Sequence, residues 1–97
     1  MSVSITSQQK SYLRGLAHEK KPVVRLGEKG LTDAVVKSVE QALLDHELIK
    51  VRLDRPDDKK SQAQSLAERT GAVLCGLIGH TVILYRPHPE KPRIHLP

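Results

Sequence analysis

The sequence contains no Phe and no Trp, and Tyr12 and Tyr85 are its only aromatic residues. A sheet built from this chain therefore lacks the exposed aromatic rings on which RNA bases stack in RNA-recognition-motif proteins. The hydrophobic fraction is 38% over 97 residues, which is enough for one modest core made of Leu, Val, Ile and Ala. This length predicts a single domain.

The sequence has one cysteine, Cys75, so no disulfide can form within the chain. Its place in an apolar run predicts a buried structural thiol, and the lack of a disulfide framework fits a reducing compartment. No charged segment followed by an apolar run marks a signal peptide, and no apolar run approaches the ~20 residues that span a bilayer. We therefore expect a cytoplasmic protein without a membrane partner.

Catalytic and metal-binding patterns are also missing. None of the five histidines pairs with another His or Cys at zinc-ligand spacing. Asp54, Asp57 and Asp58 form a polar loop without the bidentate Glu of a calcium loop, so we assign them to the loop and to the cap of the next helix. No Walker loop or dinucleotide fingerprint is present. The sequence predicts no enzyme activity, no cofactor, no metal site and no small-molecule substrate.

What the chain does have is positive charge. Sixteen Lys and Arg against eleven Asp and Glu give a formal charge of +5 and a pI near 9.6. Between Lys10 and Lys29 there are six basic and only two acidic residues, so this window alone carries a charge of +4. A small domain with clustered cations suggests a polyanionic partner, although net charge gives no specificity.

A Gly-x-x-Gly loop lies at the end of this basic window. The apolar run Val23–Leu26 predicts a short strand, Gly27 and Gly30 predict a tight loop, and Thr32 followed by Asp33 predicts the start of a helix. Free N–H groups, the helix dipole and nearby cations make such a loop a candidate phosphate site. An ordinary strand-to-helix turn has the same spacing. The neighbouring cations are Lys21, Arg25 and Lys29.

Hydrophobic periodicity divides the rest of the chain into helices and strands. The order helix-strand-helix-strand-helix-strand-strand predicts a compact α/β domain with a four-stranded mixed sheet and right-handed crossovers. We expect helices from about Ser7 to the connector at 18–21, over 33–45 and over 59–70, and further strands over 48–53, 73–78 and 81–85.

The strand over 48–53 alternates, which predicts that Ile49, Val51 and Leu53 face the core, with the other three residues on an outer face. If this strand lies beside Val23–Leu26, then Arg25, Lys50 and Arg52 share the outer face. These cations either bind the partner or are simply solvated, and the same alternatives hold for Lys10 and Arg14 on the first helix.

The C-terminal part of the chain is apolar and then rich in proline. The run Val73–Ile78 is nearly all apolar, which predicts a strand covered on both faces. Gly79-His80 predicts a two-residue hairpin turn to the last strand. Residues 87–97 contain four prolines and two cations, which predicts an extended, mobile tail that adds loose electrostatic contacts.

Several motifs together resemble the CRM domain, a family named for chloroplast RNA splicing and ribosome maturation. Because the chain is one bare domain, it is similar to the stand-alone bacterial YhbY-type proteins. The matching stretches follow one another over nearly the whole chain, which is more specific than the glycine loop alone. They are Gln9–His18, Lys21–Val24, Gly27–Thr32, His46–Val51, Thr70–Ala72 and Ile78–Pro87.

The resemblance implies a fold similar to the C-terminal domain of translation initiation factor three, with a CRM-like domain over residues 1–86 and a tail over 87–97. It implies RNA binding through the loop from Gly27 to Gly30 and association with precursors of the large ribosomal subunit. Family loops often carry a small or basic residue where this chain has Glu28. Because a carboxylate repels phosphate, Lys29 and the backbone amides would have to dominate binding here.

The leading hypothesis is thus an RNA-binding protein that assists assembly of the large ribosomal subunit, with ribosomal RNA and also ribosomal proteins as candidate partners. A general DNA-binding or nucleoid protein fits the composition and charge equally well, and a module that docks on a ribosomal protein is a third reading. The predicted RNA-binding residues are Lys10, Arg14, Lys21, Arg25, Gly27, Glu28, Lys29, Gly30, Lys50 and Arg52.

Overall fold

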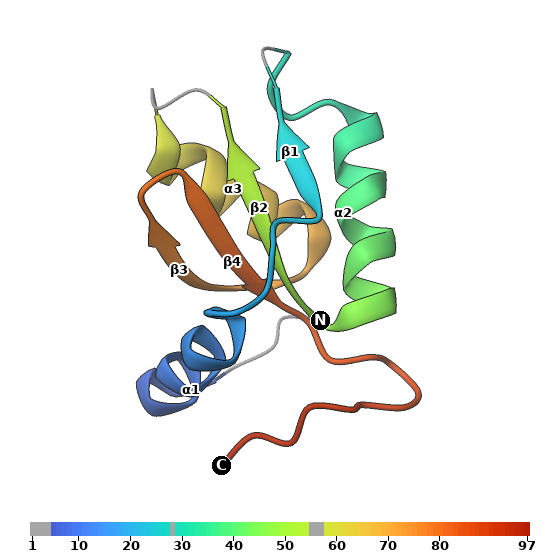
Figure 1. Ribbon diagram of the computed structural model, residues 1–97. Helices are drawn as coiled ribbons and strands as arrows, with labels where there is room; N and C mark the ends of the chain where they lie inside the picture. The colour runs from blue at the N-terminus through green and yellow to red at the C-terminus, as the bar shows by residue number, and fades with distance from the viewer. Residues whose placement is uncertain (1–4, 28, 55–57) are drawn as a thin grey trace.

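A computed structural model describes residues 5–27, 29–54 and 58–97 (Figure 1). The predicted order of helices and strands is confirmed. Within the described ranges, every helix is too short or too polar to cross a membrane. The elements are α1 (Ser7–Ala17), β1 (Val24–Leu26), α2 (Asp33–His46), β2 (Leu48–Leu53), α3 (Lys59–Thr70), β3 (Val73–Ile78) and β4 (Thr81–Tyr85).

The four strands form one mixed sheet in the order β1-β2-β4-β3. β1 and β2 are parallel, whereas β2–β4 and β3–β4 are antiparallel. The β3–β4 turn has two residues, because Ile78 pairs with Thr81, and Gly79 has the positive φ of +59° that primed hairpin turns require. The α/β class, the mixed sheet and the hairpin are therefore as the sequence predicts.

Local signals in the sequence fix where the helices begin and end. At α1, the hydroxyl of Thr6 accepts from the N–H of Gln9, and the side chain of Gln9 accepts from the N–H of Thr6, which completes a capping box. At α2, the hydroxyl of Thr32 accepts from the N–H of Val35. α3 ends at Gly71, whose φ of +68° is the left-handed conformation common after a helix.

Asp58 does not cap α3 as the sequence suggested. It stands at the N-cap position, but its φ of 57° is left-handed, and its side chain makes no capping hydrogen bond. An N-cap residue normally has an extended backbone, which aims its side chain at the first-turn amides. The left-handed backbone removes that alignment. Of the other two Asp residues of this loop, Asp54 pairs with Arg25, and Asp57 lies outside the described residues.

The two faces of the sheet are covered unequally. α2 and α3 cover one face with the main core, in which Val39, Leu43 and Leu66 meet the strands. α1 covers only part of the other face, where Leu13 and Ala17 join a smaller cluster (Figure 1). No helix covers the rest of that second face in the described part of the chain.

Two predictions about burial are only partly right. β3 is contacted on both faces as expected, since Leu74 and Leu77 pack against the main core and Cys75 lies in the α1 cluster, but the cover is incomplete and Ile78 is 62% exposed. Leu48 lies on the predicted outer face of β2, but it is buried there because it packs in the α1 cluster. Strand order and helix placement are long-range properties, so neither follows from the local pattern.

The tail makes specific contacts, whereas the sequence predicted only loose electrostatic ones. The tail is extended, but Ile94 and Leu96 pack against the α1 cluster. The fully buried carboxylate of Glu47 holds it, because this carboxylate accepts hydrogen bonds from three tail N–H groups. The donors are His88 (2.8 Å), Arg93 (2.8 Å) and Ile94 (3.0 Å). The tail runs below the C-terminal end of α2 and back toward α1 (Figure 1).

Candidate functional site

The glycine loop leaves β1 and closes on itself before α2 begins. The N–H of Gly30 donates to the carbonyl oxygen of Gly27 (3.0 Å), and the N–H of Thr32 donates to the carbonyl oxygen of Gly30 (3.0 Å). Gly30 has a φ of +71° and open space around the position of a β-carbon, so its backbone conformation rather than crowding favours glycine there. Glu28, which the sequence placed in this site, lies outside the described residues.

The first turn of α2 supplies N–H groups that the loop does not use. The hydroxyl and the carbonyl oxygen of Thr32 take the N–H groups of Val35 (3.2 Å) and Val36 (3.0 Å). The N–H groups of Asp33 and Ala34 take no partner within the described part of the chain. They are the donors that a helix N-terminus offers to an anion.

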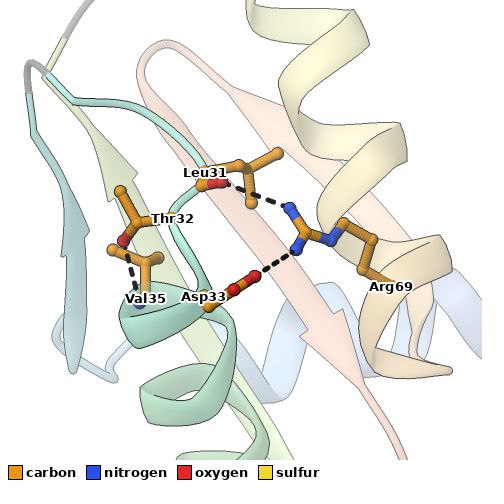
Figure 2. Close-up of polar contacts among 5 residues, drawn as sticks. All are labelled: Leu31, Thr32, Asp33, Val35 and Arg69. Carbon is orange, nitrogen blue, oxygen red and sulfur yellow. Dashed lines mark hydrogen bonds and ion pairs between the residues drawn. The ribbon is translucent and has the colours of Figure 1, made fainter.

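An arginine from α3 contacts this helix start from the side. Arg69 donates from Nη1 to the carbonyl oxygen of Leu31 (3.2 Å) and from Nη2 to Oδ1 of Asp33 (3.0 Å). Figure 2 shows the guanidinium reaching across from α3 to both acceptors, beside the Thr32–Val35 cap. The contact ties the loop exit to a helix that lies 36 residues further along the chain.

A first basic hollow, of about 400 Å³, lies along β1. Lys21, Arg25 and Arg52 line it. Arg25 and Arg52 are register partners on β1 and β2, and their neighbours Val24 and Val51 face the main core, so both arginines lie on the face away from α2 and α3. The sequence-based expectation that these two residues share a face is confirmed.

One acidic group weakens the charge of this hollow. Nε of Arg25 lies 3.4 Å from Oδ1 of Asp54, and the side chains are 67% and 36% exposed. An exposed pair of this kind contributes little to stability. It leaves the guanidinium of Arg25 accessible and its charge only partly compensated.

A second hollow, of about 240 Å³, opens on the same sheet face near α1. Arg14 and Lys50 line it together with His18, Ile78, Thr81 and Ile83. Both predicted cations also bind main-chain carbonyl groups. Nη1 of Arg14 donates to Cys75 (2.8 Å), and Nζ of Lys50 donates to His18 (3.3 Å).

The side chain of Arg14 lies close over a glycine of β3. A β-carbon added to Gly76 would come within 2.9 Å of Cδ of Arg14. Gly76 follows a register shift between β3 and β4, which leaves the carbonyl oxygen of Cys75 free to accept the guanidinium. Arg14 is therefore held in one place, with its remaining N–H groups beside the hollow.

The family model described as "CRS1 / YhbY (CRM) domain" matches residues 5–86. The chain belongs to the CRM family. A protein of Haemophilus influenzae named "RNA-binding protein" is 42% identical over 96 residues, covering 97% of this chain and 96% of the relative. "Probable RNA-binding protein YqeI" of Bacillus subtilis is 35% identical, covering 96% of this chain and 99% of the relative.

A solved structure has the same fold as this CRM domain. The solution structure of the hypothetical protein SAV1595 from Staphylococcus aureus superposes with a TM-score of 0.84 at 38% identity, covering 97% of this chain and all of the other. The family resemblance that the motifs suggested is thus confirmed. The α/β architecture is confirmed with it.

Within this CRM domain the predicted site residues fall into three groups. The loop holds Gly27, Lys29 and Gly30, and the two hollows on the open sheet face hold five more predicted cations. Lys10 lies one turn before Arg14 on α1 and lines neither hollow. Sequence reasoning missed Arg69 and His18. No local signal marks Arg69, because its partners lie on another helix.

The thiol of this CRM domain is not suited to nucleophilic chemistry. Burial raises the pKa of Cys75 to about 11, although the positive charges of Lys10 and Arg14 act in the opposite direction. The thiol is therefore protonated near neutral pH. The interpretation of Cys75 as a buried structural residue is confirmed.

Proposed function

We propose that this protein binds RNA through the phosphates of its backbone, using the loop from Gly27 to Gly30, the free amides at the start of α2 and the basic sheet face. The observation that carries this proposal is the placement of Lys21, Arg25 and Arg52 in one hollow along the strand that leads into the loop. The names of the relatives, which describe RNA-binding proteins, support RNA as the polyanion.

The chemistry of the surface favours phosphate contacts over base stacking. The chain has only two aromatic residues, and Tyr85 is buried. Lys and Arg side chains with helix N-terminal amides recognise phosphate groups and the shape of a folded RNA, whereas sequence readout needs unstacked bases and aromatic platforms. We expect a preference for structured RNA.

The biological role we propose is assistance in assembly of the large ribosomal subunit, in the cytoplasm and without enzymatic activity. This role follows from the family resemblance, and ribosomal RNA of the subunit precursor is the proposed ligand. Ribosomal proteins are secondary candidate partners. Co-sedimentation of the tagged protein with subunit precursors on a sucrose gradient tests the role, and a signal only in soluble fractions contradicts it.

Binding to a structured ribosomal RNA fragment across a salt series tests the molecular function, with matched duplex DNA as competitor. Neutralising about five phosphates gives a log–log salt slope between roughly −3.5 and −4.5. Equal competition by DNA favours a general DNA-binding protein. A salt-independent affinity favours a docking module on a ribosomal protein.

The loop itself is tested with Gly30→Asp. This variant places a carboxylate in the proposed phosphate site, and we expect an affinity loss of about tenfold or more, since one lost charge-assisted contact costs roughly 1.5–3 kcal/mol. Gly71→Asp is the matched control, because Gly71 has nearly the same φ (+68° against +71°) and equally open surroundings. It adds the same charge and strain at the end of α3. Equal affinities for the two folded variants would contradict the loop assignment.

A further inference from the structure

The start of α2 presents a conflict of charge. Asp33 is the first residue of the helix, and its side chain is 92% exposed. A carboxylate there stabilises the helix through the dipole. The same carboxylate repels a phosphate that approaches the N–H groups of Asp33 and Ala34, which take no partner among the residues that the structure describes. One residue thus favours the fold and opposes the proposed ligand.

Arg69 resolves this conflict in the geometry of Figure 2. Its two terminal nitrogens bind the Asp33 carboxylate and the Leu31 carbonyl oxygen at 3.0 and 3.2 Å. The first contact offsets the negative charge, and the second fixes the backbone just before the free amides. The planar guanidinium supplies both donors from one group, whereas the ammonium of a lysine is a single point charge.

We propose that Arg69 is a positioning residue for RNA binding, which neutralises Asp33 and thereby keeps the start of α2 receptive to phosphate. The inference rests on the proposed function of the loop. Two of the five N–H groups of Arg69 are bound by protein oxygens at the start of α2, and in this proposal Arg69 acts through those contacts rather than as a phosphate ligand. It acts through the charge of Asp33.

A positioning role and a direct phosphate contact predict different salt dependences of RNA binding. Removing a cation that touches phosphate makes the log–log salt slope shallower by about 0.7–0.9. Removing a cation that only compensates Asp33 lowers the affinity but leaves the number of neutralised phosphates unchanged. Neutralising Asp33 as well should then restore binding, since no charge remains to be compensated.

The experiment measures RNA affinity and salt slope for Arg69→Ala, Asp33→Asn and the double variant, with thermal unfolding recorded for each. We expect Arg69→Ala to weaken binding about two- to fivefold, the range of a charge effect at a helix N-terminus. The double variant should bind within about twofold of the unaltered protein. The salt slope should be unchanged in all three.

Three results would overturn the proposal. If the double variant binds as weakly as Arg69→Ala, Arg69 has a purely structural role, because Asp33→Asn did not repair the loss. If the slope of Arg69→Ala becomes shallower by about one phosphate contact, Arg69 is itself a ligand. An unchanged affinity in Arg69→Ala also contradicts the proposal.

RNA binding by Lys29→Ala distinguishes an error in the inference on Arg69 from an error in the assignment of the loop as the RNA site. Lys29 is an exposed cation in the loop, so its loss should weaken binding and make the slope shallower. If Lys29→Ala and Gly30→Asp have this effect and Arg69→Ala has none, only the inference on Arg69 fails. If none of the three variants affects RNA binding, the loop site fails and the inference fails with it.

Discussion

The two ends of α2 each carry a carboxylate, in opposite surroundings. Asp33 at the N-terminus is 92% exposed and meets one guanidinium. Glu47 at the C-terminus is fully buried, has a positive φ of 64°, and accepts three backbone N–H groups from the tail. One end of the helix is thus open to an external ligand, whereas the other end is closed by the chain's own tail.

The pKa of Glu47 reflects this difference. Burial acts to raise the pKa of its carboxyl, but the hydrogen bonds from His88, Arg93 and Ile94, helped by the charge of Arg93, outweigh burial and lower the pKa below 4.5. The folded protein therefore holds Glu47 as an anion because its own backbone solvates that charge. At this end of α2, the carboxylate of Glu47 binds N–H groups of the protein's own tail. At the loop end, the N–H groups of Asp33 and Ala34 take no partner among the described residues.

Glu47→Ala should have the largest effect of any single change at these two ends. It leaves the N–H groups of His88, Arg93 and Ile94 without their acceptor, and we expect a loss of about 3 kcal/mol in the free energy of unfolding. Urea denaturation measures the loss, and hydrogen exchange at the three amides reports release of the tail. Stability within about 0.5 kcal/mol of the unaltered protein would show that the tail contacts are dispensable.

The same carboxylate should make stability depend on pH at the acid side. Because the folded pKa lies below the unfolded value of 4.5, the contribution is complete above about pH 4.5 and disappears as the pH falls through the folded pKa. Urea midpoints from pH 7 to pH 3 measure this loss. Glu47→Gln, which cannot ionise, should have a flatter profile in that window. Parallel profiles for the two proteins would contradict the assignment.

The sequence predicts the loop end of α2 far better than the tail end. Thr32 and the two loop glycines form a local pattern, so the strand, the turn and the helix start follow from neighbouring residues. Glu47 reads as an ordinary residue at the exit of a helix, because its partners lie more than 40 residues away. Burial that depends on a distant segment leaves no local trace.

The basic face of the sheet shows the same limit of prediction from the sequence. Alternation along β2 correctly placed Lys50 and Arg52 on the side of the strand that faces away from the main core. It did not indicate that Lys50 would donate to His18 or that Arg14 would lie across Gly76, because both contacts depend on where α1 packs. The residue types at the site were predictable, and their engagement with main-chain carbonyl groups was not.

Ile94→Pro tests the tail end with a smaller change. Proline lacks the N–H that donates to Oε1 of Glu47 (3.0 Å), but it also removes the apolar side chain that packs near α1. Ile94→Ala is the matched control, since it loses the packing and keeps the donor. We expect Ile94→Pro to be less stable than Ile94→Ala by about 1 kcal/mol in urea denaturation. Equal stability would assign the role of Ile94 to packing alone.

Asp33→Asn should have the smallest effect on stability, although it makes the same carboxylate-to-amide change as Glu47→Gln. The side chain is exposed, its ion pair with Arg69 is screened by solvent, and the loss of a charge near the helix N-terminus costs about 0.3–1 kcal/mol. Glu47→Gln should cost more, about 2 kcal/mol, because a buried amide group then faces backbone donors. Paired urea curves for the two variants measure the contrast. If Asp33→Asn lowers the free energy of unfolding as much as Glu47→Gln does, the polar contacts at the two ends of α2 contribute equally to stability. That result would contradict the view that the loop end is open to an RNA ligand and the tail end is closed.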